Sequence, residues 1–144
     1  MVSDVINAIT EAIAAEFPPK DGYDIYVGDV PQGFDPKTFI VTSIFPMRDK
    51  KSYSAYEYSD LVAVQYNPQN GQTEIDDVTS RLQDCLEIII VTHNGQEKPT
   101  RTVQTDYAVV DGILTYTLRV NDVYFRDIEG DEMEGIESVE IGVS

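Results

Sequence analysis

Two strand-like runs, at 25–30 and 38–45, lie on either side of a Pro31-Gln32-Gly33 turn. Both runs are rich in β-branched and aromatic residues, which favour an extended backbone. A chain that places two such runs so close together must build much of its fold as a sheet. We expect a first strand at about 23–30 and a second at about 38–45.

A helix is predicted on each side of these strands. Apolar residues recur at helical spacing over 5–13, after Ser3 as the expected N-cap, and the run stops at Phe17, which precedes two prolines. A second apolar face recurs over 74–91, and Thr73 is its expected N-cap. Both helices are therefore expected to be amphipathic and to cover one face of a sheet.

The remaining segments add three more strands. The third is expected at 53–66, where alternate positions are hydrophobic, and the segment 92–100 is expected to be a polar loop. Two further strands are expected at 101–110 and 113–124, joined by Asp111-Gly112, a strong hairpin signal. The predicted fold is α+β: a two-layer sandwich with two helices on one face of a mixed, mostly antiparallel sheet of about five strands.

We expect a single domain over 1–126 and an acidic tail over 127–144 that packs on that domain or extends it. The tail carries seven acidic residues, and hydrophobic residues punctuate it. The N-terminus lacks the positive charge of a signal peptide, and no apolar run approaches the length of a membrane span. A protein made in the cytoplasm and not secreted is therefore predicted, with no membrane partner. The single cysteine fits a reducing compartment.

The chain is strongly acidic, with 26 acidic and 10 basic residues and a net charge of −16. Nucleic-acid binding draws its affinity from Lys and Arg that displace counterions, so this balance disfavours it. Anionic membrane surfaces are disfavoured for the same reason. The charge fits either simple solubility or a surface that must not stick to DNA passing nearby.

No catalytic, cofactor or metal site is predicted. Cys85 and His93 could form a nucleophile and a base, but Cys85 lies on the apolar face of the expected helix and His93 in a polar loop. Acidic residues at 127–131 have the spacing of a calcium loop, yet its required glycine is Glu132 and its final glutamate is Ser138. Asp76 and Asp77 fit the first turn of a helix better than a metal pair.

One group of cations stands out in this acidic chain. Arg48, Lys50 and Lys51 lie within four positions, in a segment (46–52) that is expected to be a loop. Such a run is either a solvated loop or a patch that meets the acidic surface of a neighbouring copy. The sequence alone favours neither interpretation.

Several segments, in their order and spacing, resemble the tail terminator family of tailed phages and prophages, especially those of Gram-positive hosts. The segments are Ile9 to Pro18, Ile25-Tyr26, Val30 to Phe34, Thr38 to Val41, Val62 to Pro68, Leu82 to Leu86, Val110 to Tyr116 and Met133 to Ile136. The chain differs from the family's pattern in its acidity and in its extended tail after Met133.

The resemblance implies a structural virion protein with no catalytic residues and no cofactor. It implies a homo-oligomeric ring of six copies that caps the growing tail tube, stops its polymerisation and presents a surface to the head connector. Its partners would be further copies of the chain, the tail tube protein and the connector or stopper protein. DNA would pass through the lumen without specific binding, because an acidic lumen repels it. The expected place is the head–tail junction of the virion.

In this interpretation the subunit or partner contacts are Arg48, Lys50 and Lys51, the edge strands, and also Gln32 and Phe34 in the turn after the first strand. Three alternatives stay open. One is an acidic DNA mimic that inhibits a DNA-binding protein, and one is another head–tail joining protein of similar fold. A small metal-dependent hydrolase would need a tight carboxylate cluster around a cleft, which the sequence does not show.

Overall fold

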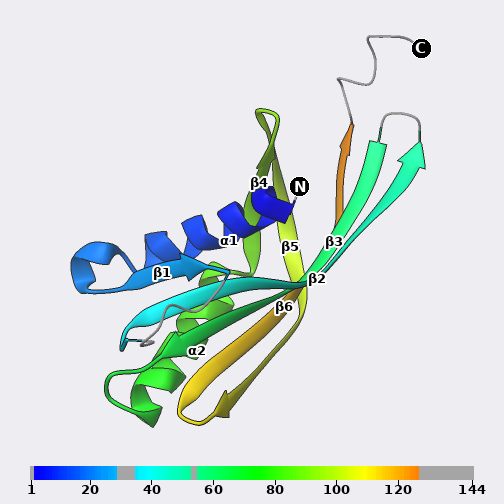
Figure 1. Ribbon diagram of the computed structural model, residues 1–144. Helices are drawn as coiled ribbons and strands as arrows, with labels where there is room; N and C mark the ends of the chain where they lie inside the picture. Colours follow the sequence, from blue (N-terminus) through cyan, green and yellow to red (C-terminus); the bar gives the residue numbers. More distant parts are fainter. Residues whose placement is uncertain (1, 29–34, 53–54, 127–144) are drawn as a thin grey trace. The chain divides into compact units, whose positions relative to one another are not determined.

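The structure is a computed structural model that describes the backbone of residues 2–28, 35–52 and 55–126 and the side chains of 4–28, 35–46 and 59–121. Figure 1 traces these elements in chain order. They are α1 (Val2–Glu16), the short 3-10 helix η1 (Pro19–Asp21), β1 (Asp24–Val27), β2 (Thr38–Ser52), β3 (Ala55–Asn67), α2 (Gln72–Cys85), β4 (Ile88–His93), β5 (Gln96–Val110) and β6 (Ile113–Arg126).

The strands form one six-stranded sheet in the order β1-β2-β3-β6-β5-β4. β1 pairs with β2 in parallel, whereas β5 pairs antiparallel with both β4 and β6. The helices α1 and α2 contact each other and pack on one face of the sheet. The α+β class, the mixed sheet and the two helices on one face are confirmed, with one strand more than predicted.

By its internal contacts the chain divides into two units. The first contains residues 1–46 and 60–121, and with them both helices, β1, β4 and β5. The second contains residues 47–59 and 122–144, of which the structure describes parts of β2, β3 and β6. The tail 127–144 lies outside the described residues, so the single domain over 1–126 and the packing of the tail stay predictions.

The apolar face of α1 and a cluster of aromatic side chains form much of the core of the first unit. Phe17, which follows α1, contacts Phe39 of β2 with ring centroids 4.8 Å apart, and Phe39 contacts Tyr66 of β3 at 4.6 Å. Tyr23, which precedes β1, packs against the edge of Phe17 at 5.1 Å. The expected end of the first helix at Phe17 is confirmed, because the ring turns into the core and two prolines follow. Ser3 lies inside α1, which begins at Val2, so the prediction of Ser3 as the N-cap is wrong. The start of the helix differs from the prediction by only one or two residues, as is common for helix ends.

The second helix is shorter than predicted. α2 ends at Cys85, and the residues expected to continue it form β4 instead. Along β4 the side chains of Ile88 and Ile90 are exposed while those of Ile89 and Val91 are buried, which is the period of a strand. Five consecutive β-branched residues, Ile88 to Thr92, favour a strand, and the pairing with β5 stabilises it.

The predicted polar loop at 92–100 is also wrong. It forms the end of β4, a tight turn and the start of β5. Asn94 and Gly95 make the turn with positive φ angles of 51° and 79°, the geometry that twisted two-residue hairpins require. Asp111 and Gly112 adopt the same kind of turn, with φ angles of 53° and 78°, so the predicted hairpin between β5 and β6 is confirmed.

The start of α2 differs from the prediction. Thr73 lies inside the helix, and the N-cap position is Gly71, which has no side chain that could cap the helix. The carboxylate of Glu74 accepts hydrogen bonds from the backbone N–H groups of Gln69 (3.0 Å) and Asn70 (2.7 Å). This carboxylate ties the loop between β3 and α2 to the first turn of the helix.

The predicted loop at 46–52 is part of β2, which runs without interruption to Ser52. Pro46 and the cations after it have low intrinsic strand propensity, and pairing in the sheet overrides that preference. β1 ends at Val27, and residues 29 and 30 of the predicted first strand lie outside the described part.

Candidate subunit-contact surfaces

The structure describes the predicted contact residues only in part. The backbone of Arg48, Lys50 and Lys51 belongs to β2, although their side chains are not described, and Gln32 and Phe34 lie outside the described residues altogether. Their role as contacts stays a prediction.

The outer surface of α2 is acidic. Three of its aspartates and the glutamate that follows it are exposed: Asp76, Asp77, Asp84 and Glu87. The only basic residue in α2 is Arg81, and its guanidinium is paired with the carboxylates of Glu16 and Asp77. Opposite charges on separate elements of a protein can set the register in which its copies meet.

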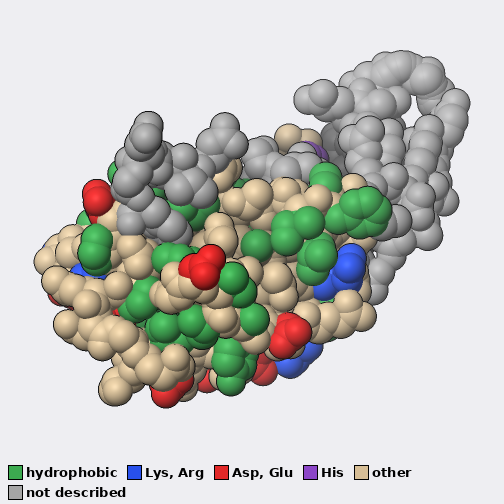
Figure 2. All heavy atoms as spheres, turned by 60° about the horizontal axis from the view of Figure 1, so that its bottom comes forward, with side chains coloured by type: hydrophobic (Ala, Val, Ile, Leu, Met, Phe, Trp, Pro, Cys, Tyr) green, Lys and Arg blue, Asp and Glu red, His purple; other side chains and the backbone are tan. Residues whose placement is uncertain are grey.

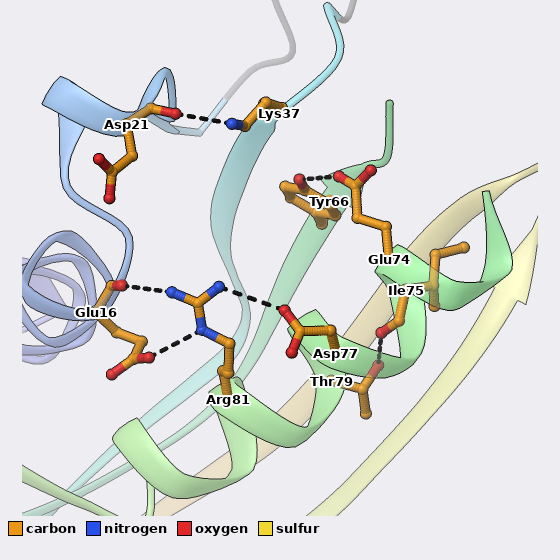
Figure 3. A network of polar contacts seen from close by, with 9 residues as sticks. All are labelled: Glu16, Asp21, Lys37, Tyr66, Glu74, Ile75, Asp77, Thr79 and Arg81. Atoms are coloured by element: carbon orange, nitrogen blue, oxygen red, sulfur yellow. Dashed lines mark hydrogen bonds and ion pairs between the residues drawn. The ribbon is translucent and has the colours of Figure 1, made fainter. Parts of the chain in front are cut away.

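Arg81 joins α2 to the end of α1 (Figure 3). Its Nε donates to a carboxylate oxygen of Glu16 at 2.9 Å, and its Nη2 donates to the Glu16 backbone carbonyl at 2.8 Å. Its Nη1 reaches Asp77 at 3.4 Å, and the guanidinium lies 4.2 Å from the centre of the Phe17 ring. Burial opposes the charge, but the hydrogen bonds to Glu16, Tyr23 and Asp77 together outweigh it and raise the pKa of Arg81. The contact fixes the otherwise open carbonyl end of α1.

Glu74 and Tyr66 form the second polar link in Figure 3. The Tyr66 hydroxyl donates to the Glu74 carboxylate across the gap between β3 and α2. Burial raises the pKa of Tyr66, and the hydrogen bond to Glu74 adds to that rise. For Glu74, burial opposes ionisation, but the bonds from Tyr66, Asn70 and Gln69 outweigh it, and its pKa is lowered.

Replacing Glu74 with glutamine is expected to weaken the fold at neutral pH by about 1 kcal/mol, because the carboxylate holds charge-assisted hydrogen bonds. A carboxyl whose pKa is lowered by folding stabilises the protein above its unfolded pKa of about 4.3 and loses that effect as the pH falls through the folded pKa. The variant should therefore show less acid destabilisation than the parent in urea titrations at about pH 7 and about pH 3.

Tyr66→Phe is the matched control, because it keeps the Glu74 carboxyl and removes one donor to it. Its acid sensitivity should lie between those of the parent and Glu74→Gln. An identical pH dependence in all three proteins would show that Glu74 does not carry the effect.

A shallow hollow of about 400 Å³ lies beside this link. Tyr23, Lys37, Gln69, Asn70, Thr73, Glu74 and Asp77 line it. Lys37, at a positive φ of 62°, donates from Nζ to the Asp21 carbonyl at 2.7 Å and lies 4.3 Å from the centre of the Tyr23 ring. Its ammonium group is thus engaged in closing the turn before β2.

Cys85 and His93, the two residues considered as a nucleophile and a base, both have structural surroundings that account for them. Burial raises the pKa of the Cys85 thiol to about 12, with the negative charge of Glu16 adding to it, so the thiol is protonated at neutral pH. His93 is not in a loop, as predicted, but at the end of β4, where its Nδ1 lies 2.6 Å from a carboxylate oxygen of Asp4 in α1. Within the described ranges no group of three potential metal ligands gathers, and no helix there is long and apolar enough to cross a membrane.

Exposed hydrophobic side chains concentrate on the strands, and Figure 2 shows several clusters of them on one face with few charged residues between. They are Tyr26 and Val27 in β1, Ile44 and Phe45 in β2, Ile88 and Ile90 in β4, and Tyr107, Val109 and Val110 in β5. Both outer strands of the sheet, β1 and β4, belong to this set. Exposed apolar side chains at sheet edges are typical of surfaces that are covered in an assembly.

Comparison with known proteins gives the chain its family. The family described as "Phage tail terminator protein" matches residues 4–132. The chain belongs to the phage tail terminator family. The recognition made from the sequence is therefore confirmed, and the chain is a structural protein of the phage tail that interacts with other tail and head proteins. No curated protein matched.

Solved structures with a similar fold include two that share little sequence with this terminator chain. One comes from "Virion of native gene transfer agent (GTA) particle", with 11% identity and a TM-score of 0.49 over 81% of this chain and 92% of that one. A second, without a descriptive name, has 13% identity and a TM-score of 0.46 over 88% of this chain and 95% of that one. Both scores are below 0.5, so the family assignment rests on the match over 4–132.

Sequence reasoning missed the apolar character of the β4 and β5 edges. The run Ile88 to Val91 also fits the face of a helix, and that interpretation does not predict its two exposed isoleucines. The available signal was the pair Asn94-Gly95, which predicts a hairpin as strongly as Asp111-Gly112 does.

Proposed function

We propose that six copies of this tail terminator protein form a ring that caps the tail tube, ends its polymerisation and provides the joining surface for the head connector or stopper protein. The observation that carries the proposal is the family match over 4–132. In this proposal the chain acts by binding alone, without a catalytic residue or a cofactor, at the head–tail junction.

The proposed contact between neighbouring copies joins the cations of β2 to the acidic surface of α2. Arg48, Lys50 and Lys51 lie on one strand, whereas the exposed acids of α2 lie on a helix, so one copy can offer the first to a neighbour and the second to the other neighbour. Opposite charges on different elements of one subunit favour a head-to-tail arrangement and disfavour a symmetric dimer.

The net charge of −16 supports the passage of DNA without binding. An acidic lumen repels the phosphate backbone, so packaged DNA would cross the ring without being held. If neutralising the acids that line the lumen left ejection and infectivity unchanged, this part of the proposal would be wrong.

A charge-reversal variant tests the contact. Arg48→Glu/Lys50→Glu/Lys51→Glu should lose ring formation at concentrations where the parent forms rings, as measured by light scattering and negative-stain images. The matched control, Lys20→Glu/Lys98→Glu/Arg101→Glu, changes the net charge equally at three cations outside β2. The control should keep its rings, since general repulsion alone would affect both variants alike.

Rings in both triple variants would refute the contact and leave the ring intact. Loss of rings in both would attribute the effect to net charge and would also refute the contact. A parent protein that stays monomeric even with tail tubes would refute the ring, and competitive binding to a basic DNA-binding protein would then favour the DNA-mimic alternative.

A further inference from the structure

β5 is much longer than the strand that covers its outer side. It runs from Gln96 to Val110, but β4 pairs only with its first part, from Gln96 to Arg101. Among the described residues, the rest of β5 has a partner on one side only, which is β6. Every residue from 105 to 110 is exposed, as expected for an open sheet edge.

In the open stretch of β5, residues 105–110, the face of the sheet that is buried elsewhere is exposed to solvent. Tyr107 pairs with Tyr116 and Val109 pairs with Leu114, and directly paired residues lie on the same face of a sheet. Tyr116 and Leu114 are 1% and 0% exposed, whereas Tyr107 and Val109 are 53% and 42% exposed. The buried apolar layer of β6 thus continues onto β5, where it is exposed.

A bulge separates the covered and open parts of β5. The pairing with β6 shifts between Val103 and Asp106, and Gln104 there has a positive φ of 53°. Beyond the bulge, the backbone N–H of Tyr107 donates to the exposed carboxylate of Asp106 at 2.8 Å. This N–H group can readily exchange its bond to the exposed Asp106 side chain for a bond to another strand, so the strand edge remains able to pair.

The opposite edge of the same sheet is open in a similar way. In the part of the chain that the structure describes, β1 pairs with β2 along Asp24 to Val27 and is the last strand of the sheet on that side. Its side chains Tyr26 and Val27 are exposed. Each copy therefore presents two different apolar edges, one at each end of one sheet.

We infer that the β1 edge of one copy pairs with the open stretch of β5, residues 105–110, in a second copy, so that the sheet continues from subunit to subunit. The inference rests on the proposed ring. Backbone hydrogen bonds would supply the strand pairing, and Tyr26 and Val27 would bring apolar side chains up to Tyr107 and Val109. Two different edges make a head-to-tail contact, which can close into a ring. Pairing of two β5 edges would stop at a dimer and leave both β1 edges exposed.

Cross-linking between two single-cysteine proteins tests this contact. In a Cys85→Ser background, one protein carries Val27→Cys and the other carries Val109→Cys. Both positions are exposed, so neither change should disturb the fold. The full-length proteins are mixed, alone and with tail tubes, and treated with a short bismaleimide while the mass of the same samples is measured by light scattering. We expect the mixed dimer in at least tenfold excess over the controls.

Two controls bracket the result. Val109→Cys alone reports pairing between two β5 edges, and Val27→Cys mixed with Ile90→Cys places the second thiol on β4, an equally exposed apolar edge. Rings that give no mixed dimer, or that cross-link equally in either control, overturn this contact and leave the ring standing. Samples that stay monomeric even with tail tubes overturn the ring, and the inference fails with it.

Discussion

Replacing Phe39 with alanine is expected to lower the free energy of unfolding by about 3–5 kcal/mol. Its side chain is fully buried, and its ring packs between Phe17 and Tyr66. Alanine would remove that buried apolar surface and leave a cavity among aromatic rings that cannot all collapse into it. Urea denaturation followed by circular dichroism measures the change.

Phe45→Ala is the matched control for this change. It removes the same atoms from the same strand, but the Phe45 side chain is exposed. Its effect on the unfolding free energy should be about 0.5 kcal/mol or less. Equal losses in the two variants would show that the aromatic cluster is not the centre of the core.

The second large effect is expected for Arg81→Ala, at about 2–3 kcal/mol. The change removes two short hydrogen bonds to Glu16 and the stacking on Phe17, and it leaves the last carbonyls of α1 without that donor. Arg81→Lys should recover only part of the loss, because an ammonium cannot donate in two directions with the fixed geometry of a guanidinium. Thermal and urea denaturation of the parent, Arg81→Ala and Arg81→Lys test both predictions.

Arg101→Ala serves as the comparison for a surface ion pair. Arg101 lies 3.1 Å from Glu87, with both side chains more than half exposed, and such pairs contribute about 0–1 kcal/mol. If Arg81→Ala cost no more than Arg101→Ala, the link between α1 and α2 would be no stronger than an ordinary surface contact.

The sequence predicts the fold best where local pattern and tertiary packing agree. The α1 face from Val5 to Ile13 and the turn at Asp111-Gly112 are signalled by spacing and by turn chemistry, and the structure confirms both. The run Ile88 to Val91 satisfies a helical face and a buried strand equally well over so few residues. Only its pairing with residues 98–101 of β5 decides between them, and that contact is not local.

The candidate contact surfaces are harder to predict, for a related reason. The cations at 48–51 are visible in the sequence, but their placement on a strand depends on pairing between β2 and β3. The open stretch of β5 follows from the difference in length between two paired strands, which no local pattern records. Tyr107 and Val109 alternate as core residues do, so the sequence cannot show that they are left uncovered.

The mass of the assembly tests the central claim most directly. Light scattering on a sizing column, over a concentration series and with tail tubes present, should reveal rings of six 16.1-kDa copies, about 97 kDa in total, with closed circles in negative-stain images. A chain that stays at 16.1 kDa under all of these conditions, tubes included, would contradict the account of this protein as a ring-forming tail terminator.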